Sequence, residues 1–86
     1  MNPKHELYYK MVGLNIAYYR KLHNLSQMAL AEEVNLSRTH ISNIEAPNMK
    51  TRLSLESLFD IADALGISPK DLLDFRGMEK KEQDDN

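Results

Sequence analysis

The segment from Ser26 to Glu45 constrains the fold of this chain more than any other stretch, because it contains two short helical patterns separated by a tight turn. Leu30 and Val34 are four residues apart, and Ile41 and Ile44 are three apart. Residues at these spacings share one face of a helix, so each pair predicts a short amphipathic helix.

A serine precedes each of these two helices and predicts where it begins. The hydroxyls of Ser26 and Ser37 can accept hydrogen bonds from backbone N–H groups that a helix leaves free in its first turn. Asn35 tolerates the left-handed conformation that ends a helix sharply, and Leu36, apolar in a turn, is expected to fold back into the core. Ala31 leaves room for the two helices to cross closely. The segment therefore predicts a helix-turn-helix.

This pattern resembles that of the small phage-repressor-like regulators, the Cro/cI-type or XRE family, and the resemblance covers about residues 12–75. It implies an all-α fold, a compact five-helix lambda-repressor-like DNA-binding domain with the helix-turn-helix at its second and third helices. The matching residues are Arg20, Ser26, Gln27, Leu30, Ala31, Val34, Leu36, Ser37, Ile41, Ser42, Ile44, Glu45, Leu58, Ala62, Leu65, Gly66, Ile67, Leu72 and Leu73.

A first helix is expected before the motif, from about residue 6 to residue 23. Val12 and Ile16 belong to a helical apolar stripe, and Asn24 is expected to end the helix in the left-handed conformation. Gly13 lies inside the helix. It indicates either close approach of another helix or a locally weaker helix.

Two more helices are expected after the motif. Pro47 cannot continue the third helix. Ser54 is expected to cap a fourth helix that stops at Gly66. Ser68 and Pro69 are expected to begin a short fifth helix. That helix is expected to carry Leu72, Leu73 and Phe75.

The length of 86 residues is that of one domain. We expect a frayed N-terminus over residues 1–5. The helix-turn-helix domain is expected over residues 6–77, and a charged, disordered tail over residues 78–86.

The composition excludes several classes of protein. The chain has no cysteine, so it forms no disulfide and no zinc finger of the cysteine type. No apolar run has the length of a signal-peptide core or a membrane span, which predicts a cytoplasmic protein with no membrane contact. The resemblance to DNA-binding regulators implies that it is nucleoid-associated. His5, His23 and His40 lack metal-ligand spacing. We predict no enzyme activity, no catalytic residue, no metal, no cofactor and no small-molecule ligand.

The net charge of −2 is unusual for a protein that binds DNA, but the charge is unevenly distributed. Residues 1–54, which contain the motif, carry a net charge of +3, whereas residues 55–78 carry −3 and residues 79–86 carry −2. A positive half that contains the predicted recognition helix favours nucleic-acid binding.

The second helix of such a motif lies in the major groove of DNA. Matched to the family's positions, Arg38, Thr39 and Asn43 are the expected base readers. The guanidinium of Arg38 suits guanine O6 and N7, and the amide of Asn43 suits adenine N6 and N7. Contacts to the DNA backbone or to flanking groups are expected from Gln27, Ser37, His40, Ser42, Asn48 and Lys50.

Arg20 and Glu45 have a different expected role. A carboxylate at the end of the recognition helix repels phosphate, and in the family the matching pair is a salt bridge between the first and third helices. We therefore expect a structural salt bridge between Arg20 and Glu45.

No separate oligomerisation domain is evident in the sequence. The fifth-helix region, with Ile67, Leu73 and Phe75, is the expected homodimer interface, because symmetric dimers match inverted-repeat operators. Leu72 is expected to belong to the core.

The primary expectation is a sequence-specific transcriptional regulator of double-stranded DNA, a repressor or a protein similar to restriction–modification controllers. One alternative is the antitoxin of a toxin–antitoxin pair, with a toxin as protein partner. The other is a protein-interaction module that has lost DNA binding.

Overall fold

The computed structural model describes residues 2–46 and 51–76, and within these ranges the chain forms five helices and no strand. The all-α prediction, with the helix-turn-helix at the second and third helices, is therefore confirmed. The helices are α1 (Pro3–Leu22), α2 (Gln27–Glu33), α3 (Arg38–Glu45), α4 (Leu55–Leu65) and α5 (Pro69–Leu72).

The first helix begins earlier than predicted. The side chain of Asn2 accepts a hydrogen bond from the N–H of Lys4 at 2.8 Å, and Pro3 occupies the first turn, where its missing N–H is not needed. The expectation that residues 3–5 precede the helix was wrong, because the Asn2 cap and Pro3 begin the helix at residue 3.

The caps and stops of the motif are those predicted. Ser26 Oγ accepts from the N–H of Ala29 at 3.0 Å, and Ser37 Oγ accepts from the N–H of His40 at 2.9 Å. Asn35 has a φ of 56°, and half-buried Leu36 packs against the core. These features turn the chain sharply between α2 and α3.

The other predicted stops also form. Asn24 after α1 has a φ of 57°, and Gly66 after α4 has a φ of 67°, both in the left-handed region that ends helices. Ser54 Oγ caps α4 through the N–H of Ser57 at 3.1 Å. Residue 77, the expected end of the domain, and the expected tail over residues 78–86 lie outside the described residues.

The fifth helix is shorter than predicted. It has four residues and ends at Leu72, so Leu73 and Phe75 lie in the segment after it. Asn15 on α1 explains the path of that segment, because its Nδ2 donates to the carbonyl oxygens of Leu72 and Asp74 at 3.1 and 3.2 Å. These backbone carbonyls bond to α1 instead of continuing the helix.

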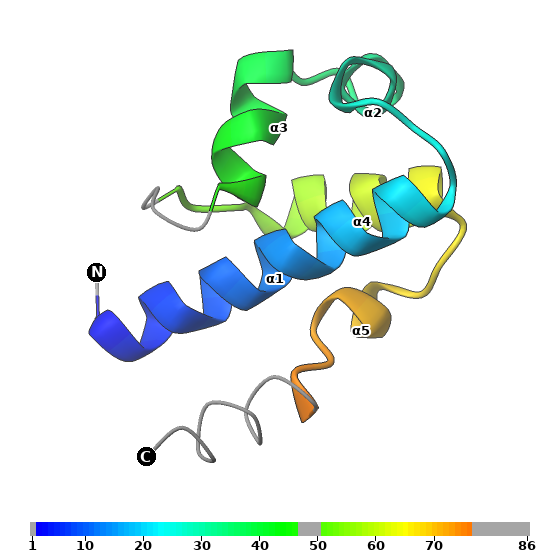
Figure 1. Cartoon of the computed structure of the whole chain (residues 1–86). Helices are drawn as coiled ribbons and strands as arrows, with labels where there is room; N and C mark the ends of the chain where they lie inside the picture. The colour runs from blue at the N-terminus through cyan, green and yellow to red at the C-terminus, as the bar shows by residue number, and fades with distance from the viewer. Residues whose placement is uncertain (1, 47–50, 77–86) are drawn as a thin grey trace.

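One core holds the helices together. Helix α1 runs through the middle of the molecule, with α3 and α2 on one side of it, α5 on the other and α4 behind (Figure 1). The fully buried Ile16, Ile41 and Ile61 come from α1, α3 and α4. The remaining core residues are Val12, Leu30, Ala31, Val34, Ile44, Leu58, Ala62, Leu65 and Leu72. Leu72 is therefore a core residue, as predicted.

Within the described ranges, none of the helices is both long enough and apolar enough to span a bilayer.

Candidate nucleic-acid interface

Two buried residues on the inner side of α3 determine which of its residues face outward. Ile41 is fully buried and Ile44 is 6% exposed, so both anchor α3 to the core. Thr39 and Asn43 are four residues apart on the opposite side of the helix. The structure thus places two of the three expected base readers in one row on the outer face of α3.

The other polar residues of α3 surround this row. Arg38, in the first turn, is exposed, whereas His40 and Ser42 are half-buried. The exposed Ser37 uses its hydroxyl oxygen as the cap acceptor, which leaves its O–H free to donate. The whole surface from residue 37 to residue 43 therefore presents hydrogen-bond donors and no carboxylate.

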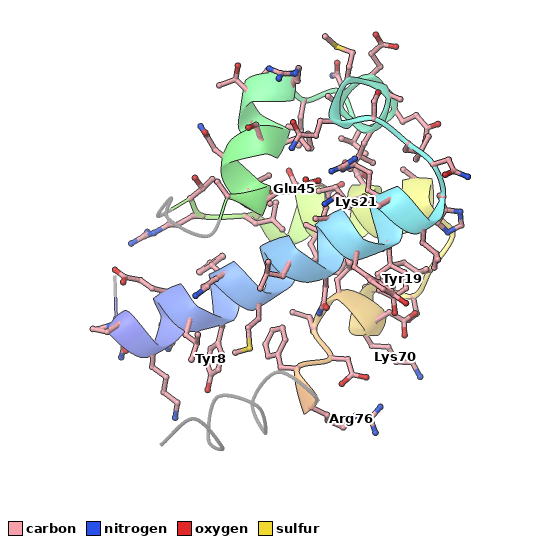
Figure 2. The ribbon with its side chains drawn as sticks, in the orientation of Figure 1. Tyr8, Tyr19, Lys21, Glu45, Lys70 and Arg76 are labelled. Atoms are coloured by element: carbon pink, nitrogen blue, oxygen red, sulfur yellow. The ribbon has the colours of Figure 1, made fainter. Side chains whose placement is uncertain are left out.

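The single carboxylate of α3 points inward. Glu45 lies where α3 meets α1 (Figure 2). Arg20 Nε donates to Glu45 Oε2 at 2.7 Å, and Arg20 Nη2 donates to Glu45 Oε1 at 2.9 Å. The two side chains are only 10% and 6% exposed. The geometry is that of the predicted structural salt bridge, and it removes the acidic group from the outer surface of α3.

The arginine of this pair makes a third hydrogen bond. Its Nη1 donates to the carbonyl oxygen of Leu25 at 2.7 Å, so Arg20 also holds the segment between α1 and α2. The hydrogen bonds to Glu45 raise the pKa of Arg20 above its usual value, and burial acts in the opposite direction. Arg20 therefore keeps its positive charge throughout the physiological pH range.

Gln27 joins the same network. Its Nε2 donates to Glu45 Oε1 at 3.0 Å, which ties the start of α2 to the end of α3. Gln27 was expected at the DNA backbone, and its hydrogen bond to Glu45 was not predicted from the sequence. Because one N–H of the amide faces Glu45, the other remains available to a phosphate.

Gly13 permits the close contact between α1 and α3. A Cβ built on Gly13 would overlap the carbonyl oxygen of Ile44 and lie 3.2 Å from the carbonyl carbon. Of the two explanations left open by the sequence, close approach of another helix is therefore the one that applies. The contact sets how far α3 stands out from α1.

Two of the expected backbone contacts, Asn48 and Lys50, lie outside the described residues. Arg52, just after that gap, is exposed.

The three residues expected at a dimer interface differ in exposure. Ile67 and Phe75 are half-buried against the core, and Phe75 stacks on Tyr8 with ring centroids 5.8 Å apart. Leu73 is 48% exposed. Sequence reasoning missed Asn15, whose two hydrogen bonds hold this segment in place; a polar residue beside the buried stripe of α1 was the available signal.

Two charged residues follow Leu73. Arg76 donates from Nη2 to Asp74 Oδ2 at 2.8 Å, and its hydrogen bonds lower the pKa of Asp74 to about 2. Both side chains are largely exposed, so the pair adds little to the free energy of unfolding.

Comparison with known proteins decides the family. A family model described as helix-turn-helix matches residues 16–72, which is most of the chain and contains α2 and α3. The chain belongs to the helix-turn-helix family. The resemblance to phage-repressor-like regulators is thereby confirmed.

Relatives of this chain include a control protein and an immunity repressor. The control protein C.BamHI of Bacillus amyloliquefaciens is 47% identical over 60 residues, which are 70% of this chain and 72% of that protein. The immunity repressor of Bacillus phage phi105 is 38% identical over 72 residues, which are 84% of this chain and 49% of that protein.

A solved structure of the regulator SinR, described as the master regulator for biofilm formation in complex with DNA, superimposes with a TM-score of 0.67. It is 33% identical to this chain. The match covers 73% of this chain and 98% of that chain.

Proposed function

We propose that this helix-turn-helix protein is a transcriptional regulator that binds a specific sequence in double-stranded DNA. It acts as a repressor or in the manner of a restriction–modification controller. Its α3 lies in the major groove, and two copies bind the two halves of an inverted repeat. Binding to chromosomal DNA makes the cytoplasm, at the nucleoid, its place of action.

One observation carries this proposal. The outer surface of α3 presents donors from residue 37 to residue 43, and the one carboxylate of the helix is held by Arg20 and Gln27 on the inner side. Phosphates and the acceptor-rich edge of guanine are bound by donors, and carboxylates repel phosphates. A surface for a basic protein partner would need the opposite charge.

The relatives support the same function. A control protein and a phage immunity repressor are similar over most of this chain, and the structure of SinR contains DNA.

We expect Arg38→Ala to weaken binding to the preferred DNA by about 1–3 kcal/mol and to relax the preference for one guanine. The exposed guanidinium is the group on α3 that can bind O6 and N7 together. Fluorescence anisotropy on duplexes that differ at single base pairs measures both effects. Glu33→Ala, an exposed change on α2, is the control. Equal loss on every duplex would make Arg38 a phosphate contact instead.

We expect Leu73→Asp to convert the dimer to a monomer and to lower affinity for a full inverted repeat at least tenfold. Leu73 is the exposed apolar residue of the proposed interface, and a buried, unpaired carboxylate opposes association. Sedimentation equilibrium and anisotropy on full and half sites measure the two effects. A variant that remains dimeric would place the interface elsewhere.

A further inference from the structure

An exposed apolar stripe runs along the outer side of α1. Leu14, Tyr18 and Leu22 follow one another at four-residue intervals and are 39%, 60% and 60% exposed. Val12 and Ile16, on the other side of the helix, are in the core. We call the three exposed residues the α1 stripe.

A second apolar patch lies on α4. Leu55 and Phe59 are four residues apart and are 66% and 44% exposed, whereas Leu58 and Ile61 of the same helix are buried. We call Leu55 and Phe59 the α4 patch. Helix α4 lies behind α1 (Figure 1), and the stripe and the patch lie on the exposed sides of these two helices.

The charges beside these two surfaces are opposite in sign. Exposed Lys10 and Lys21 are four and three residues from members of the α1 stripe (Figure 2 labels Lys21). On α4, exposed Asp63 is four residues from Phe59, and exposed Asp60 follows Phe59 directly in the sequence. None of these four charged groups forms an ion pair within residues 2–46 and 51–76.

The acidic side is also hollowed. Asp60 and Asp63, with Glu33 from the end of α2, line a depression of about 500 Å³. Val34 and Ala64 contribute apolar wall to it. Three carboxylates around one depression favour a cationic group there.

We propose that the α1 stripe of one copy packs on the α4 patch of a second copy, so that copies associate head to tail. The apolar residues of the two surfaces are buried against each other, and the lysines beside the stripe face the carboxylates of α4. A second copy is the occupant because this chain itself carries the complementary surface, with matching four-residue spacing and opposite charge.

This contact has a consequence for assembly. It joins two different surfaces, so each copy keeps one free stripe or patch and further copies can add. It uses no residue assigned above to DNA binding or to the dimer. Head-to-tail contact therefore extends the assembly beyond the dimer.

Sedimentation equilibrium of the full chain, from micromolar to millimolar concentration, tests the proposal. We expect the average mass of the wild type to rise beyond that of a dimer. Tyr18→Ser and Phe59→Ser should each weaken this further association about tenfold or more. Both positions are exposed and absent from the DNA-binding surface, so each variant should keep its affinity for DNA at a single site.

Mixing the two variants gives the decisive result. The Tyr18→Ser chain keeps an intact α4 patch, and the Phe59→Ser chain keeps an intact α1 stripe. Their equimolar mixture should therefore form the contact that neither forms alone. Failure of the mixture to associate, or a wild-type mass that stops at the dimer at millimolar concentration, overturns the proposal.

Charge reversal provides an independent check. Lys21→Glu should weaken the association about tenfold, because two carboxylates then face each other across the contact. Adding Asp63→Lys to the same chain should restore the association, because Glu at position 21 of one copy then faces Lys at position 63 of the next. Glu32→Ser, an exposed change on α2, is the control and should have no effect. A double variant as weak as Lys21→Glu alone would contradict the proposed pairing of the two surfaces.

Discussion

Glu45→Ala is expected to destabilise the fold by about 3–5 kcal/mol, because it leaves a buried charge without its partner. The change removes both acceptors of the Arg20 guanidinium, at 2.7 and 2.9 Å, and leaves a charge that is only 10% exposed. It also removes the acceptor of Gln27. Arg20 would keep a single hydrogen bond, to the carbonyl of Leu25.

Thermal unfolding followed by circular dichroism measures this effect. A domain of this size shifts its Tm by about 4–8 °C for each kcal/mol, so the fall should be large. Glu33→Ala is the matched control, because that carboxylate is exposed and should change stability by about 0.5 kcal/mol or less.

Replacing both residues of the ion pair separates the loss of their interaction from the cost of leaving one buried charge without a partner. Arg20→Met with Glu45→Leu should recover most of the loss, because it leaves no buried charge without a partner. An unchanged Tm in Glu45→Ala would show that the pair contributes nothing to the fold.

Gly13→Ala is expected to destabilise the domain by about 1–3 kcal/mol or more, although alanine favours helices over glycine. The new Cβ overlaps the carbonyl oxygen of Ile44, which is backbone and cannot rotate away. The strain is relieved only if α3 moves relative to α1, so affinity for DNA should fall as well.

The control is an alanine-to-glycine change at another position of α1. Ala17→Gly, at a half-buried position of α1, should cost about 1 kcal/mol through helix propensity alone. If propensity also governed residue 13, Gly13→Ala would raise the Tm, and that result would contradict the close contact between α1 and α3. Urea unfolding of the two variants distinguishes these outcomes.

The sequence predicted features that depend on neighbouring residues. Ser26 and Ser37 are caps, and Asn24 and Asn35 are left-handed stops, because each of these roles is determined within a few residues of the chain. The salt bridge of Arg20 was different, since only the resemblance to a family indicated a partner 25 positions away.

The features that were missed depend on contacts between distant segments. Asn15 bonds to carbonyls 57 and 59 residues further along the chain, and no periodicity marks such a pair. The same contacts explain why α5 ends at Leu72. The partner of Gln27 was missed for the same reason, because Glu45 comes near it only after α2 and α3 have packed.

Selection of the purified protein on randomised duplex DNA at moderate salt, followed by sequencing, tests the central claim most directly. We predict enrichment of an inverted repeat whose half-site centres are about one helical turn apart, with a guanine preference that Arg38→Ala removes. Binding that depends on salt but enriches no sequence would contradict the assignment of Arg38, Thr39 and Asn43 as base readers. The absence of binding at every salt concentration would contradict the proposed function itself.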